Sequence, residues 1–121
     1  MSEWIKRVMN NSADTLFKEY IDAWNDRDTF ELGRMFHDNV TLRDWEVEVT
    51  GRDSVIGANA NIWAAVPDIK IRVKHTAFNP DTKKIFGRIQ VYSAQQNFTI
   101  NVIDVLTLED GKIIQVSAYK Q

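Results

Sequence analysis

The hydrophobic pattern of the chain changes its period at Pro67, and this change limits the folds that the sequence can adopt. Before Pro67, apolar residues recur every three or four positions, as on one face of a helix; after it they alternate, as in strands. The alternating part divides into four expected strands at 69–78, 85–92, 98–108 and 112–119. Their connections are short and contain turn residues, which predicts an antiparallel meander.

Three helices are expected in the first part of the chain. Residues 1–11 either form a short helical arm or fray, and Ser12 or Asp14 can cap the helix that follows, from about residue 15 to residue 25. The apolar face of that helix consists of Leu16, Phe17, Tyr20, Ile21 and Trp24. A second, shorter helix opens with the capping box from Asp28 to Glu31 and ends near Phe36.

The third helix begins after Gly51, can be capped by Asp53, and ends at Pro67. Residues 40–49 precede it and have the composition of one or two strands. Helices followed by a long meander indicate an α+β class. We therefore expect one domain over residues 1–121, with 1–12 as a helical arm, in which three N-terminal helices pack on a curved, mostly antiparallel sheet.

The composition argues against several classes of protein. Hydrophobic residues make up 44% and charged residues 26% of the 121, an ordinary balance for one globular domain. A formal net charge of −2 favours neither nucleic acid nor an anionic membrane, and no apolar stretch is long enough to span a membrane. The chain has no Cys, and His37 and His75 lack ligand-spaced neighbours, so neither a metal nor another cofactor is expected. The N-terminal residues do not have a signal-peptide pattern, and a cytoplasmic location is expected.

Asp104 interrupts the apolar face of an expected strand. The other residues on that face are Phe98, Ile100, Val102, Leu106 and Leu108. An ionised carboxylate buried without a partner is very costly, so Asp104 must find a partner, border a pocket or keep its proton. Either the strand is solvated at this point, or Asp104 is an acid in a cavity floored by the strand.

Two more polar groups lie on apolar faces. Tyr20 belongs to the stripe of the first helix, and Asp44 shares its strand parity with Val40 and Leu42. Two enclosed Asp residues and a phenol suit acid–base chemistry, because one carboxylate can act as a base while the drier one keeps its proton and donates a hydrogen bond. The alternative interpretation of Tyr20 is an ordinary core residue.

Several segments resemble the nuclear transport factor 2-like superfamily. They are Tyr20–Asp28, Met35–Val40, Leu42–Trp45, Gly51–Asp53 and Val102–Ile113. Within the superfamily the chain is most similar to ketosteroid isomerases and their SnoaL-like relatives, over about residues 13 to 120. The resemblance implies a cone of three helices and a curved sheet, commonly dimeric through the sheet.

The resemblance also implies roles for the three polar groups. In ketosteroid isomerases a Tyr and a protonated Asp form the oxyanion hole, and a second Asp moves the proton. The matching residues here are Tyr20, Asp104 and Asp44, in that order. The side chains expected to contact the substrate are Trp24, Phe36, Asn59, Trp63, Val102 and Leu106.

The chain departs from the steroid isomerases at four positions. Phe36 and Asn59 stand where some of these enzymes have further tyrosines, and Lys120 stands where they have an aromatic residue against the steroid. Trp45 follows the expected base where a Pro is usual. These departures leave the three acid–base groups in place and the identity of the substrate open.

The opposite face of the Asp104 strand is apolar as well, since it carries Ile103 and Val105. A second copy of the sheet would cover that face, so a homodimer is expected. The favoured function is an isomerase that moves a proton next to a carbonyl of a small apolar substrate. The alternatives are a SnoaL-like protein that binds a small molecule without chemistry, a cyclase or epoxide hydrolase-type enzyme, and a structural dimerisation domain.

Overall fold

The computed structural model describes residues 3–121, except for the side chains of residues 5–8 and 10. The elements are α1 (Glu3–Asn25), α2 (Thr29–Met35), β1 (Phe36–Arg43), β2 (Glu48–Thr50), α3 (Arg52–Ala65), β3 (Lys70–Asn79), β4 (Lys84–Ser93), β5 (Phe98–Glu109) and β6 (Lys112–Lys120). The four strands of the meander all follow Pro67, as the sequence predicts, although the eight-residue strand β1 precedes it. Residues 40–49 contribute to two strands, β1 and β2, rather than to one.

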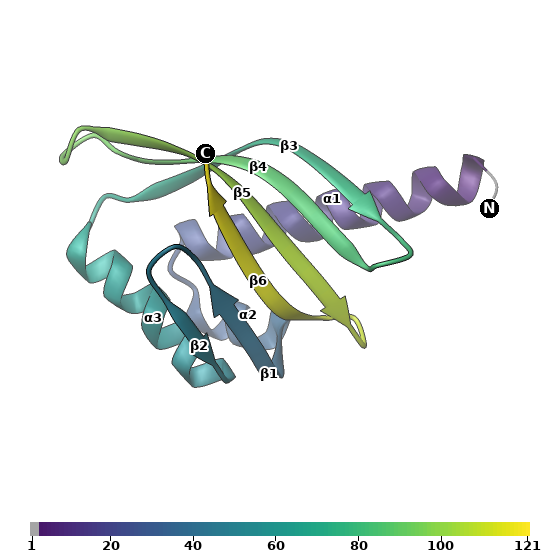
Figure 1. Ribbon diagram of the computed structural model, residues 1–121, viewed down its shortest axis with the longest axis horizontal. Coiled ribbons are helices and arrows are strands. Elements are labelled where there is room, and N and C mark those ends of the chain that lie inside the picture. Colours follow the sequence, from purple (N-terminus) through teal and green to yellow (C-terminus); the bar gives the residue numbers. More distant parts are fainter. Residues whose placement is uncertain (1–2) are drawn as a thin grey trace.

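The six strands form one mixed sheet in the order β2-β1-β6-β5-β4-β3. Strands β3 to β6 make the predicted antiparallel meander, and β1 pairs antiparallel with β2. Strand β1 also lies parallel to β6, which joins the first hairpin to the far end of the meander. Helix α1 runs across the sheet, and its N-terminal part extends beyond the strands (Figure 1). Three helices on a mostly antiparallel sheet confirm the predicted fold class.

Helix α1 is longer than the sequence indicated. It continues without a break from Glu3 to Asn25, so the prediction that Ser12 or Asp14 caps it was wrong. The Asp14 carboxylate instead accepts a hydrogen bond from the Thr76 hydroxyl at 2.7 Å and pairs with Lys18 at 3.0 Å. These partners allow a cap-type residue to sit inside a helix. Residues 1 and 2 of the predicted arm lie outside the described residues.

Helix α1 packs closely on the strand next to Asp104. Phe17 is fully buried, and a Cβ atom added to Gly87 of β4 would lie 2.0 Å from its ring. Only glycine permits this approach of helix and strand. Gly87 is the register partner of Asp104 on β5, and Tyr20 follows Phe17 by one helical turn. The contact therefore sets the distance between the phenol-bearing face of α1 and the acid.

The two shorter helices begin with different kinds of cap. Asp28 accepts a hydrogen bond from the Glu31 N–H at 3.0 Å, which confirms the predicted N-cap of α2. Asp53, in contrast, does not cap α3: Gly51 is the N-cap at φ 103°, and Asp53 lies in the first turn. An acid there still interacts favourably with the positive end of the helix dipole.

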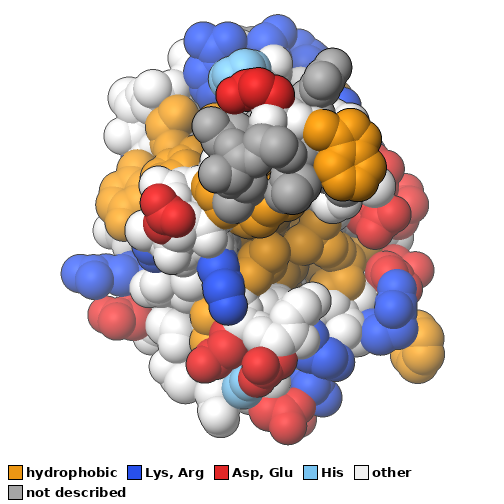
Figure 2. Space-filling model, turned by 90° about the vertical axis from the view of Figure 1, so that its right-hand side faces the viewer, with side chains coloured by type: hydrophobic (Ala, Val, Ile, Leu, Met, Phe, Trp, Pro, Cys, Tyr) orange, Lys and Arg blue, Asp and Glu red, His pale blue; other side chains and the backbone are white. Residues whose placement is uncertain are grey.

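The surface bears charges of both signs. The end of the molecule that carries the start of α1 shows acidic and basic side chains around a hollow containing hydrophobic groups (Figure 2). No helix within residues 3–121 is long and apolar enough to cross a membrane.

Candidate active site

A cavity of about 310 Å³ lies between the helices and the sheet face that they cover. Most of its wall is aliphatic or aromatic, with side chains from α1, α3 and five strands. The polar side chains in this wall are few, and four of them are Tyr20, Asp44, Asn59 and Asp104. The structure therefore brings the three predicted acid–base groups to one cavity. An apolar enclosure with a small number of convergent polar groups is typical of a small-molecule site.

Asp104 is placed by the alternation of β5, whose helix-covered face also carries the buried Val102 and Leu106. The Asp104 side chain is 5% exposed, and its Oδ1 atom has no hydrogen-bond partner among the described residues. Burial raises the pKa of this carboxyl to about 7, and the negative charge of Asp44 adds to the shift. At pH below about 7 the group is mainly a neutral acid, able to donate a hydrogen bond. Of the two environments considered for Asp104, the structure has the dry cavity rather than the solvated edge.

Tyr20 reaches the cavity from α1 and is buried. Its ring packs against Phe36 with centroids 6.1 Å apart. Burial, followed by the nearby charge of Asp104, raises the pKa of the phenol well above its ordinary value. The hydroxyl therefore stays protonated, and it makes no hydrogen bond to any side chain that the structure describes. Tyr20 therefore lies close enough to Asp104 for the charge of that carboxylate to affect the pKa of the phenol.

Asp44 lies at the end of β1, where the chain turns into β2. Its Oδ1 atom accepts hydrogen bonds from the backbone N–H groups of Glu46 at 2.8 Å and Val47 at 2.7 Å. This Asx-type turn holds the carboxylate in place at the cavity wall. Oδ2 takes part in no hydrogen bond within residues 3–121, so one oxygen of a fixed, half-buried carboxylate remains available to a bound molecule.

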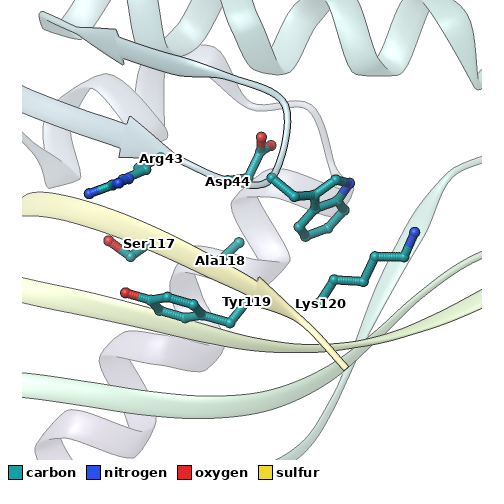
Figure 3. Close-up of a pocket in the computed structure, with 7 residues that line it drawn as sticks. Arg43, Asp44, Ser117, Ala118, Tyr119 and Lys120 are labelled. Carbon is teal, nitrogen blue, oxygen red and sulfur yellow. The ribbon is translucent and has the colours of Figure 1, made fainter.

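Asp44 also borders a second hollow, of about 440 Å³, on the other side of β6. In Figure 3 the side chains of Ser117 and Tyr119 from β6 lie in this hollow, while the Asp44 carboxylate points away from them toward the β1–β2 turn. The Lys120 ammonium stands 5.7 Å from the centre of the Trp45 ring, and Trp45 lines both spaces. Lys120 therefore contacts the rim of the main cavity through Trp45 and is not part of its wall.

Asn59 is the fourth polar group, and α3 presents it within an otherwise apolar stripe. Trp24 Nε1 donates a hydrogen bond to Asn59 Oδ1 at 3.1 Å. The same indole packs edge-on against Trp63, with centroids 5.5 Å apart. A bond between α1 and α3 thus closes one side of the cavity.

The predicted substrate-contact residues fall into two groups. Trp24, Asn59 and Val102 line the cavity. Phe36, Trp63 and Leu106 are not among the residues of its wall, so the structure places them behind the lining residues and not at the cavity surface. Phe36 and Trp63 instead pack against the lining residues Tyr20 and Trp24, and Leu106, the next inward residue after Asp104, is fully buried in the core. All three are large apolar residues on the correct face, and only the depth of the cavity separates lining from core.

Sequence reasoning missed the part of the wall that β3 and β4 supply: Ile71, Ile89 and Val91. Their inward parity is readable from alternation, but their position at the cavity depends on how the strands are paired. Among the described side chains, no three His, Asp or Glu residues are grouped as metal ligands.

Solved structures share this architecture at low sequence identity. A protein from Kribbella flavida, provisionally described as a ketosteroid isomerase, superposes with a TM-score of 0.79 at 16% identity, covering 93% of this chain and 79% of its own. A protein from Jannaschia sp., provisionally described as a SnoaL-like polyketide cyclase, gives 0.80 at 12%, covering 93% and 87%. The epoxide hydrolase/cyclase-like enzyme SalBIII of salinomycin pyran-ring formation gives 0.73 at 19%, covering 92% of each. At these identities the likeness establishes the fold alone.

The fold is the α+β cone of nuclear transport factor 2-like proteins. A family model for the SnoaL-like domain matches residues 17–116, and the chain belongs to that family. No curated protein matches the sequence. The resemblance inferred from the sequence segments is confirmed.

Proposed function

We propose that the protein is an isomerase that moves a proton next to a carbonyl of a small, largely apolar substrate. The carbonyl oxygen lies against Tyr20 and the protonated Asp104, and Asp44 acts as the base. The observation that carries this proposal is the juxtaposition of a buried acid of pKa about 7 and a phenol in one apolar cavity with a second carboxylate. Such a pair of donors stabilises negative charge on oxygen without carrying a positive charge itself.

The proposed reaction has two proton transfers. The available oxygen of Asp44 takes a proton from the carbon next to the carbonyl, and the electron pair of that C–H bond becomes the new C=C bond of an enolate. Tyr20 and Asp104 donate hydrogen bonds to the enolate oxygen, in a wall that excludes most water. Asp44 then returns its proton to another carbon of the conjugated system, so the substrate is isomerised and the enzyme is regenerated.

The test uses a simple β,γ-unsaturated cyclic ketone, 3-cyclohexenone, whose conversion to the conjugated enone is followed by ultraviolet absorbance. Asp44→Asn should abolish turnover, because an amide cannot accept the proton. Asp104→Asn keeps a donor and should lose about 10²–10³ in kcat at most, the typical cost of one oxyanion donor. Asp26→Asn, at an exposed residue outside the cavity, is the matched control and should leave turnover unchanged. Full activity of Asp44→Asn would refute the assignment of the base.

Two alternatives draw on the same cavity. A SnoaL-like protein that only binds a small molecule would bind 2-naphthol, a planar mimic of an enolate, with dependence on Tyr20 and Asp104 but would not turn over the ketone. A cyclase or epoxide hydrolase-type enzyme would use the same acids, and the likeness to SalBIII is one reason to include this reaction class. Deuterium incorporation next to the carbonyl in D₂O separates proton abstraction from binding alone and from epoxide hydrolysis, whereas formation of a new ring bond identifies a cyclase.

We also propose that two copies pair through the sheet face opposite the helices. The cross-strand pairs Phe86–Val105 and Ile103–Tyr119 form an apolar patch there. Val105 is already buried within one chain, whereas Phe86 is 39% and Tyr119 59% exposed. Phe86→Lys should therefore dissociate the dimer in sedimentation, without the damage that a buried Val105→Lys would cause. A wild-type chain of 14.0 kDa that sediments only as a monomer at micromolar concentration would refute the pairing. The cytoplasmic location stays a prediction.

A further inference from the structure

One half of the Asn59 amide is in use and the other half has no partner. Trp24 Nε1 is a pure donor, so the atom of Asn59 that it contacts at 3.1 Å must be the oxygen. This hydrogen bond fixes the orientation of the amide and leaves Nδ2 with two N–H donors on the other side. Nδ2 is buried and has no hydrogen-bond partner within residues 3–121.

The cavity can supply the missing acceptor. Asn59 is 4% exposed, yet it is one of the residues that line the cavity wall. The next lining residues along the chain, Ile62 of α3 and its C-cap residue Val66, have apolar side chains that offer no acceptor. A buried N–H group without a partner destabilises the protein, and a bound oxygen would remove that penalty.

We propose that Asn59 Nδ2 binds an acceptor oxygen of the substrate, different from the oxygen held by Tyr20 and Asp104. The placement of the first oxygen rests on the proposed function. Trp24, which holds the amide, follows Tyr20 by one turn on the same face of α1, so the amide and the phenol are separate points along one wall. Because Trp24 donates to Oδ1, the part of the amide that is left without a partner is the donor Nδ2.

This arrangement defines a substrate class. The substrate is a small carbonyl compound with a second oxygen that accepts a hydrogen bond, such as an ether, ester or ketone, on an otherwise apolar skeleton. A ketone that has only hydrocarbon at the second position would leave Nδ2 buried and unpaired. A site that loses a hydrogen bond in this way discriminates more strongly than an apolar pocket that merely tolerates a change of shape.

The experiment compares probes that differ in one atom. Methoxy-2-naphthols and the ethyl-2-naphthols of the same shape are titrated by calorimetry, with the substituent placed in turn at each free position of the distal ring. In the wild-type protein at least one methoxy isomer should bind about tenfold more tightly than its ethyl counterpart, the ratio that one additional hydrogen bond produces. Asn59→Leu, which removes the donor at similar volume, should abolish this ratio. Asn61→Leu, at an exposed position of α3, should retain it.

A second variant and a measurement on the wild-type protein keep the proposal testable if Asn59→Leu does not fold. Asn59→Ala removes the amide donor and leaves a smaller apolar side chain, so it too should lose the ratio. In the wild-type protein, the ¹⁵N resonance of the Asn59 side-chain amide should shift with the methoxy probe and stay unchanged with the ethyl probe.

The outcomes separate the two proposals. If every methoxy isomer binds like its ethyl counterpart, or if Asn59→Leu keeps the tenfold ratio, Asn59 does not recognise a substrate oxygen and a bound water is its partner. This result would leave the acid–base proposal intact, because 2-naphthol binding would still depend on Tyr20 and Asp104. Loss of that dependence, tested with Tyr20→Phe, would overturn the placement of the first oxygen and with it the two-oxygen substrate.

Discussion

The raised pKa of Asp104 predicts a specific loss of stability with pH. The pKa of the carboxyl is about 7 in the folded protein, against an ordinary value of 3.8. Between these two values the folded state keeps a proton that the unfolded state releases, so the free energy of unfolding falls as pH rises. A difference of about three pKa units corresponds to a loss of about 4 kcal/mol in the free energy of unfolding. The loss begins above pH 3.8 and reaches its full size above about pH 7.

The substitution that tests this pH dependence of stability is Asp104→Asn, which keeps the shape of the side chain and removes its ionisation. Guanidinium unfolding of the wild-type protein and the variant is measured at pH 4.5 and at pH 8.5. The free-energy difference between the two proteins should shift in favour of the variant by about 3 kcal/mol over this interval, because most of the titration lies within it. Subtracting one protein from the other cancels groups that titrate equally in both.

Asp44→Asn tests the second cause of the raised pKa of Asp104, which is the negative charge of Asp44. Removing the neighbouring negative charge should lower the pKa of Asp104 while leaving most of the burial effect in place. If the difference between wild type and Asp104→Asn is flat with pH to within about 0.5 kcal/mol, Asp104 is not a buried neutral acid, and its role as a donor fails with it.

Two further predictions concern the frame of the cavity. Gly87→Ala should destabilise the fold by about 1–3 kcal/mol in urea unfolding and weaken 2-naphthol binding, since a Cβ would lie 2.0 Å from the Phe17 ring and push α1 away; unchanged stability would mean that the helix shifts freely. Asp28→Ala should cost about 1 kcal/mol by removing the hydrogen bond from the Glu31 N–H, whereas Asp28→Asn should cost less because Asn is also a good N-cap; equal effects of the two variants would contradict this account of the cap.

The sequence determined the order and kind of the elements. The switch from a helical period to alternation at Pro67 follows from local geometry, which any amphipathic segment must obey to bury one face. Alternation also placed Asp104 on the inward face of β5 before any pairing was known. The cap at Asp28 is local as well, because donor and acceptor lie within three residues. Local rules failed where one side chain had two suitable environments: Asp14 found Thr76 and Lys18 inside a continuous helix instead of starting it.

Tertiary structure decided what borders the cavity. Phe36, Trp63 and Leu106 satisfy the same sequence pattern as Trp24, Asn59 and Val102, but they lie outside the cavity wall. The difference arises from the depth of packing, to which the parallel β1–β6 pairing and the approach of Phe17 to Gly87 both contribute.

For the chemistry of the site too, the sequence supplied the residues and the tertiary structure decided their properties. The sequence supplied an acid, a phenol and an amide on apolar faces, and this is enough to suggest a site. Their properties come from long-range contacts: burial by segments remote in the sequence raises the pKa of Asp104 to about 7, and Trp24, 35 residues away from Asn59, fixes which end of its amide faces the cavity. Burial and orientation depend on neighbours in space, so they become defined only when the chain is folded.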